Sequence, residues 1–167
     1  IPNLLGLIKN YIVFAEKDED LNKYILKQHQ TAAVEKVIAR ATDPNKMRGL
    51  VWHTQGSGKT FTMIKSADLL FKANQGDKPT ILLMIDRNEL EDQMLKNLAA
   101  LGLENVEHAK NIKKLQQLLA NDYRGIIVST VQKFRGMKAD VNTRSSIYIL
   151  IDEAHRTTGG DLGNFLM

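Results

Sequence analysis

Apolar residues recur along this chain with two different spacings, and each spacing predicts a kind of element. Four short runs are almost wholly apolar, as buried strands are: 49–53, 80–85, 125–129 and 146–151. A weaker run at 106–109 predicts a short additional strand. Elsewhere apolar residues return every three or four positions, which predicts helices over 21–41, 58–73, 88–101 and 112–120.

Strand and helix patterns alternate from residue 49 onward, and this order predicts the fold class. Near-continuous apolar strands are typical of a parallel sheet that helices cover on both faces. We therefore expect an α/β fold with at least four strands. Pro44 should end the first helix, Gly102 should cap the third, and the acidic stretch 16–20 should form a solvated turn.

Composition narrows the picture only slightly. The 167 residues suit one domain, with 43% hydrophobic and 25% charged residues. Cysteine is absent, which argues against disulfides and thiolate metal sites, and no run of about 18 apolar residues predicts a membrane span. We expect a cytoplasmic protein. The net charge of +4 is too small to indicate nucleic acid by itself.

The segment from His53 to Thr60 predicts a nucleotide site. It follows an expected strand and opens an expected helix, which is the context that a phosphate-binding loop requires. Its glycines would let backbone N–H groups turn toward phosphate oxygens, Lys59 would contact the β- and γ-phosphates, and the Thr60 hydroxyl would bind Mg²⁺. The expected ATP ligands are Thr54, Gln55, Gly56, Ser57, Gly58, Lys59 and Thr60. His53 stands where the motif usually has glycine, and we expect a steric or local hydrogen-bonding role for it.

Two carboxylates, Asp152 and Glu153, follow the last apolar strand. Functional sites of parallel α/β sheets lie at the carboxyl ends of the strands. We therefore expect Asp152 to hold Mg²⁺ through water and Glu153 to act on the attacking water, so that Lys59, Asp152 and Glu153 are the candidate catalytic residues. His155 is a candidate for sensing the γ-phosphate or for coupling to a neighbouring lobe.

Together these motifs resemble those of superfamily 2 helicases and translocases, specifically the first RecA-like lobe. Residues 51–60, 152–156 and the lead-in 4–14 are also similar to the motor of the R subunit of type I restriction endonucleases. The resemblance implies a double-stranded DNA translocase that uses ATP and Mg²⁺. It also implies that Gln30 reads adenine and that Arg87, Ser129 and Thr130 contact the DNA backbone. The alternatives are an exposed helix glutamine for Gln30 and a helix-capping charge cluster around Arg87.

The resemblance further implies the organisation of the whole enzyme. Residues 1–20 would link a missing upstream nuclease domain to the lobe at 21–167, which would be truncated at its C-terminal end. A second RecA-like lobe and the modification and specificity subunits would be its partners. This lobe would then contact DNA phosphates rather than bases, and alone it should bind ATP–Mg²⁺ weakly and hydrolyse it slowly.

Two other functions fit parts of the sequence. One is a superfamily 2 helicase of repair or RNA metabolism, which the sequence upstream of this chain would distinguish. The other is a nucleotide-binding scaffold that never hydrolyses ATP. The presence of Lys59, Thr60, Asp152 and Glu153 argues against the scaffold.

Overall fold

A computed structural model of the chain describes residues 6, 10–17, 20–46, 48–73, 76–134, 137 and 141–154. The chain divides into two compact units. The first comprises Ile1–Ala73 with Asn97–Leu103, and the second comprises Asn74–Lys96 with Glu104–Met167. The predicted domain boundary after residue 20 falls inside a strand of the first unit, and the predicted division of the chain stays a prediction.

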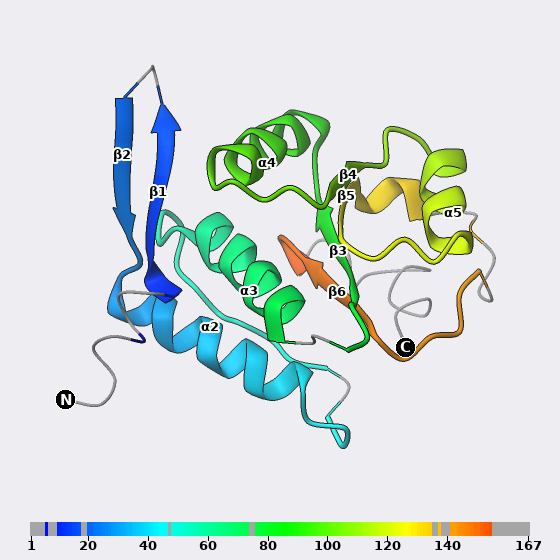
Figure 1. The fold of residues 1–167 in the computed structure, drawn as a ribbon, viewed down its shortest axis with the longest axis horizontal. Helices are drawn as coiled ribbons and strands as arrows, with labels where there is room; N and C mark the ends of the chain where they lie inside the picture. Colours follow the sequence, from blue (N-terminus) through cyan, green and yellow to red (C-terminus); the bar gives the residue numbers. More distant parts are fainter. Residues whose placement is uncertain are drawn as a thin grey trace. The chain divides into compact units, whose positions relative to one another are not determined.

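The first unit contains a hairpin that the sequence patterns did not predict, and residues 16, 17 and 20 of the expected turn belong to its strands. Strand β1 (Ile12–Lys17) pairs with β2 (Asp20–Ile25) in an antiparallel register that sets Ile12 opposite Ile25 (Figure 1). The predicted helix over 21–41 is therefore wrong for residues 21–27, because α2 begins only at Gln28. The spacing of Leu21, Tyr24 and Ile25 is helical, but pairing with β1 satisfies the backbone groups that a helix would otherwise bond.

Two helices complete the core of this unit. Helix α2 (Gln28–Ala41) and helix α3 (Lys59–Ala73) meet through Val34, Ile38 and Leu69, and Tyr11 and Leu26 join the same cluster. Helix α2 ends before Pro44, as predicted, and Thr42 closes it by donating its hydroxyl to the Ile38 carbonyl at 2.9 Å. The start of α3 directly after Gly58 also agrees with the prediction.

The segment just before the phosphate loop corrects a second prediction. Residues 49–53 were expected to form a buried strand, but the structure gives them no regular secondary structure. Leu50 and Trp52 are 75% and 85% exposed. An apolar run becomes a strand only where a neighbouring strand completes its hydrogen bonds, and none of the described strands pairs with this segment.

The second unit confirms the α/β class with a four-stranded parallel sheet. The strands are β3 (Thr80–Ile85), β4 (Val106–His108), β5 (Ile126–Thr130) and β6 (Ile147–Ile151), in the order β4-β5-β3-β6. Helix α4 (Asn88–Ala100) follows β3, α5 (Ile112–Ala120) follows β4, and the short helix η1 (Val131–Phe134) follows β5. Gly102, with φ of +67°, lies just after α4 as predicted.

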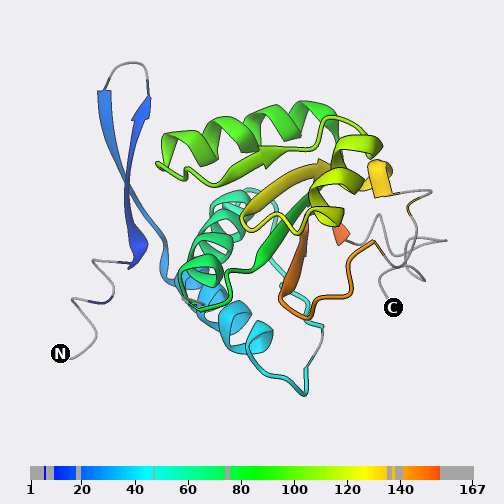
Figure 2. The same ribbon diagram turned by 45° about the vertical axis from the view of Figure 1, so that its right-hand side comes forward.

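The core of the second unit lies on both faces of this sheet. Leu115 and Leu119 of α5 pack with Leu82 of β3 and Ile127 of β5. Figure 2 shows the yellow-green helix α5 beside the sheet. The alternate side chains of β3 point to the opposite face, and Leu83 among them is also fully buried. Burial on both faces explains why β3 and β5 appear in the sequence as nearly unbroken apolar runs.

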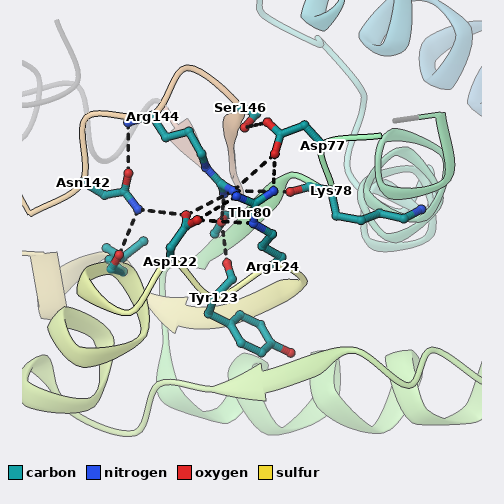
Figure 3. A network of polar contacts seen from close by, with 10 residues as sticks. Asp77, Lys78, Thr80, Asp122, Tyr123, Arg124, Asn142, Arg144 and Ser146 are labelled. Atoms are coloured by element: carbon teal, nitrogen blue, oxygen red, sulfur yellow. Dashed lines mark hydrogen bonds and ion pairs between the residues drawn. The ribbon is translucent and has the colours of Figure 1, made fainter. Parts of the chain in front are cut away.

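A polar network joins the loops at the amino-terminal ends of the strands (Figure 3). The Arg144 guanidinium lies 3.1 Å from the Asp122 carboxylate and donates to the Thr80 hydroxyl at 2.5 Å. Arg124 pairs with Asp122 at 2.9 Å and also with Asp77. Two acidic and two basic side chains therefore neutralise one another and hold the loops before β3, β5 and β6 in place.

These contacts shift the pKa values of the network. The hydrogen bond from the Ser146 hydroxyl, helped by Arg124, holds the pKa of Asp77 below its ordinary value of 3.8. For Asp122 the main cause of a lowered pKa is the hydrogen bond from Arg124. A cavity of 350 Å³ lies beside Asp122 and Arg144. It lies at the edge of the sheet opposite to the one where parallel α/β folds carry their sites.

Candidate nucleotide site and candidate DNA contacts

The predicted phosphate-binding loop has the backbone that such a loop needs. Gly56 and Gly58 have φ of +75° and +81°, in the left-handed region that favours glycine. The Ser57 N–H donates to the Thr54 carbonyl at 3.3 Å, which closes a tight turn before α3. Lys59 and Thr60 belong to the first turn of α3, and the dipole at a helix N-terminus favours an anion.

Side chains from the first turn of α2 hold this loop by its carbonyl groups. The Gln30 amide nitrogen donates to the Gly58 carbonyl at 3.0 Å, and its oxygen accepts from the Lys27 N–H at 2.8 Å. A ring nitrogen of His29 lies 3.1 Å from the Ser57 carbonyl. Because these carbonyls face α2, the N–H groups of the peptides that follow them can turn the other way. A side chain at Gly58 would collide with the Gln30 amide.

Gln30 is 6% exposed, which excludes the alternative of an exposed helix glutamine. Its amide keeps one donor hydrogen and one acceptor lone pair beyond its two backbone bonds. It lines a pocket of 210 Å³ beside Gly56, Ser57 and Gly58. Tyr24 and Phe61 line the same pocket, with their rings stacked at 5.4 Å between centroids. The aromatic pair was not predicted, because Tyr24 belongs to the unpredicted hairpin.

Two buried polar atoms of the loop have no hydrogen-bond partner among the described residues. They are the Ser57 hydroxyl oxygen and Nδ1 of His53. The His53 ring also meets the His29 ring edge-on, with centroids 5.5 Å apart. Buried polar atoms ordinarily have partners, so this loop fits a polar ligand such as a phosphate group. The His53 ring packs within the first unit, in line with its expected steric role.

The two predicted acidic residues lie directly after β6 in the second unit. The Asp152 N–H donates to the Met84 carbonyl at 2.9 Å, which continues the pairing of β6 with β3. The Asp152 carboxylate accepts from the Glu153 N–H at 3.0 Å. Glu153 has a left-handed φ of +51°, a conformation that costs a non-glycine residue about 1 kcal/mol or more. His155 lies outside the described residues.

The candidate DNA contacts lie at the same carboxyl edge of the sheet. Arg87 follows β3, and its side chain is 62% exposed with its Nε 3.6 Å from the Asp86 carboxylate. Ser129 and Thr130 end β5 but are almost fully buried, at 0% and 1% exposure. The Ser129 hydroxyl donates to the Thr130 carbonyl at 3.4 Å. A role for these three residues in DNA binding stays a prediction, and only Arg87 presents its polar group at the surface.

Known proteins place the chain in a family. Residues 29–167 match the family model described as SWI2/SNF2 ATPase, which is most of the chain. The chain belongs to the SWI2/SNF2 ATPase family. This membership, together with the parallel sheet, agrees with the RecA-like lobe that the sequence motifs implied.

The curated relatives of this ATPase chain have restriction enzyme names. A putative type I restriction enzyme MjaIXP endonuclease subunit of Methanocaldococcus jannaschii is 31% identical over 98% of the chain and 16% of the relative. The type I restriction enzyme HindI endonuclease subunit of Haemophilus influenzae is 32% identical over 95% of the chain and 16% of the relative. The SsaAORF53P endonuclease subunit of Staphylococcus saprophyticus is 29% identical over 96% of the chain and 17% of the relative.

These relatives confirm the resemblance to type I restriction endonuclease subunits. The chain spans only 16% or 17% of the length of the three relatives, so it corresponds to one part of such a subunit. Within the described residues, none of the helices combines the length and apolar character that crossing a membrane requires.

Proposed function

We propose that this chain is the ATP-binding motor lobe of a larger enzyme, the endonuclease subunit of a type I restriction system. That subunit would hydrolyse ATP with Mg²⁺, move along double-stranded DNA and cleave it. The observation that carries the proposal is the phosphate loop of an ATPase-family chain, with two left-handed glycines and its carbonyls held by α2. The names of the relatives support the restriction system.

The ATP phosphates would lie on the loop 54–60. Backbone N–H groups at the start of α3 and the Lys59 ammonium would bind them, because both favour negative charge. The adenine base would enter the pocket lined by Tyr24, Gln30 and Phe61. The remaining donor and acceptor of the Gln30 amide suit the edge of adenine, which presents one of each.

The donor set also suits Mg²⁺. This ion prefers oxygen ligands and is usually held by one or two carboxylates together with phosphate oxygens and water. The Thr60 hydroxyl and the Asp152 carboxylate would supply the protein oxygens. The described residues contain no group of three or more acidic or histidine side chains that could cage a metal alone. When bound, Mg²⁺ neutralises charge on the transferring phosphoryl group.

Glu153 would take the proton from the attacking water, or orient that water, as a general base. Full activity would need a second RecA-like lobe, because the transferring phosphoryl needs positive charge from both sides. The modification and specificity subunits would supply the DNA sequence recognition. This lobe would contact only the phosphate backbone, through Arg87 and, if β5 opens at its end, Ser129 and Thr130. We place the assembly in the cytoplasm.

The test is translocation by the full-length protein assembled with its partner subunits. A third strand bound to the duplex as a triplex should be displaced when hydrolysable ATP is present. Lys59→Ala should abolish displacement, whereas Lys72→Ala, which removes the same charge from the exposed end of α3, should not. Separation of the duplex strands would instead identify a helicase. ATP binding without any hydrolysis would identify a scaffold.

A further inference from the structure

A buried charge cluster joins three elements of the second unit. The Glu91 side chain of α4 is 5% exposed, and both of its carboxylate oxygens accept from the Lys133 ammonium at 2.8 Å. Nε2 of His108 lies 3.1 Å from the same carboxylate. Lys133 belongs to η1, and its side chain is 15% exposed. A buried carboxylate must be paired and hydrogen-bonded to be tolerated, and here two bases meet it.

The cluster lies at the carboxyl edge of the sheet. Helix α4 begins shortly after β3, His108 is the last residue of β4, and η1 follows β5 without a gap. A second tie joins two of these segments, because the Gln132 amide donates to the Asp86 carbonyl at 2.8 Å. Two interactions therefore join the segment after β3 to the segment after β5. One is the hydrogen bond from the Gln132 side chain to the backbone, and the other is the buried ion pair of Glu91 with Lys133.

The ion pair also determines which basic side chain at this edge can contact a ligand at the surface. The charge of Lys133 is turned inward and neutralised by Glu91, so it does not supply a surface charge. Arg87 is the exposed cation at the start of α4, four residues before Glu91. Arg87 directly precedes α4, and its carbonyl accepts from the Glu91 N–H at 3.2 Å. The position of Arg87 thus depends on how Glu91 anchors the first turn of α4.

We propose that Glu91 is a positioning residue for DNA binding: through Lys133 it fixes the segments after β3 and β5 as one surface for the DNA backbone. This inference rests on the proposed function, since it takes double-stranded DNA as the ligand. Glu91 would not contact DNA itself, because its carboxylate is buried and would repel phosphate. Its effect would be to keep Arg87 and η1 in fixed positions relative to each other.

The test uses the full-length protein and a labelled DNA duplex, with affinity measured by fluorescence anisotropy without hydrolysis. Glu91→Gln removes the charge but keeps the side-chain shape, and we expect the dissociation constant for DNA to rise about tenfold. The affinity for ATP should stay within about twofold, because the nucleotide contacts are not involved. Glu89→Gln removes an exposed carboxylate from the same helical turn, and it should not weaken DNA binding.

Two further variants keep the test decisive if Glu91→Gln folds poorly. Lys133→Arg preserves the ion pair and should bind DNA as the wild type does. The double variant Glu91→Leu with Lys133→Met removes both charges without leaving either unpaired, so it should fold. We expect its DNA affinity to fall about threefold or more, because the ion pair that holds α4 and η1 together is lost. Wild-type affinity in a folded double variant would overturn the proposal.

Failure of this inference can be told apart from failure of the proposed function. If the wild type binds duplex DNA but does not hydrolyse ATP, the motor function fails while the comparison of Glu91 variants still holds. If the wild type shows DNA-stimulated hydrolysis and both Glu91 variants keep wild-type DNA affinity, only the role of Glu91 fails. If the wild type does not bind duplex DNA, the DNA partner and the role of Glu91 are both wrong.

Discussion

At the amino-terminal ends of the parallel strands, Asp77, Asp122, Arg124 and Arg144 pair with one another around the loops (Figure 3). At the carboxyl ends, one ion pair is buried inside, while Arg87 is exposed and two carboxylates follow β6 side by side in sequence. The first arrangement neutralises charge and fixes loops. The second has an exposed cation, and parallel α/β folds carry their sites at this edge.

Backbone strain alone does not separate the two ends. Asp122 at the amino-terminal edge has φ of +52°, and Glu153 at the carboxyl edge has φ of +51°. They are the non-glycine residues with positive φ among those the structure describes. Their surroundings differ, because Asp122 pairs with two arginines whereas the Glu153 N–H donates to the Asp152 carboxylate. We therefore propose that the carboxyl edge serves function and the amino-terminal edge serves stability.

Removing one carboxylate from each edge tests most strongly whether the two edges have different roles. In the full-length protein Glu153→Gln should lower the rate of ATP hydrolysis by about a hundredfold or more, because an amide cannot accept the proton from water. Asp122→Asn should change that rate by less than about twofold. A steady-state ATPase assay decides between the edges, and equal losses in both variants would contradict the assignment.

Arg144 tests the stability role of the amino-terminal edge. Arg144→Ala should lower the free energy of unfolding by about 2 kcal/mol, because it leaves Asp122 and Thr80 without a partly buried charged donor. Arg124→Ala, at a more exposed position, should cost less than Arg144→Ala. Urea unfolding of the full-length protein measures both values. A larger loss of stability in Arg124→Ala than in Arg144→Ala would contradict the role given to Arg144.

Arg87 and Arg124 compare the two edges as surfaces for DNA. Arg87→Ala should weaken DNA binding several-fold and reduce the slope of log affinity against log salt by about one. Arg124→Ala removes the same charge from the opposite edge and should leave the slope unchanged. Titrations at several salt concentrations measure this difference. Equal slopes in the two variants would place the DNA elsewhere.

The smallest expected effect concerns pH. Since folding lowers the pKa of Asp122 below 3.8, the unfolded chain binds more protons in that range, and stability is lost as pH falls through it. Asp122→Asn should therefore be less stable than the wild type at neutral pH, and the difference should shrink below about pH 3.8. Melting temperatures across pH 3–7 measure this. A gap of constant size at all pH values would show that the charge of Asp122 is not responsible.

The predicted elements that proved correct are those with a single strong local signal. The apolar runs at 80–85 and 146–151 form strands as predicted, the first fully buried and the second partly buried, and the helix after Gly58 follows from its spacing and its glycine loop. Residues 21–27 have a helical spacing, and only pairing with β1 makes residues 21–25 a strand. For 49–53 the composition was right for a strand, but a strand also needs a neighbour, which local sequence does not encode.

The candidate site divides in a similar way. The loop and the two acidic residues carry chemistry in their own sequence, so they could be identified without a structure. The contacts of Gln30 and His29 with the carbonyls of the loop join residues that are 28 positions apart in sequence. The ion pair Glu91–Lys133 joins residues that are 42 positions apart. Such contacts depend on tertiary packing and leave no periodic signal along the chain. Glutamate at position 91 is indistinguishable in sequence from its exposed neighbour Glu89.

The central claim is that this chain binds and hydrolyses ATP through the loop that ends in Lys59. The most direct measurement is ATP turnover by the full-length protein, with and without duplex DNA, in the wild type and in Lys59→Ala. We predict turnover that DNA stimulates in the wild type, and a loss of about a hundredfold or more in the variant. Wild-type turnover in Lys59→Ala would contradict the claim.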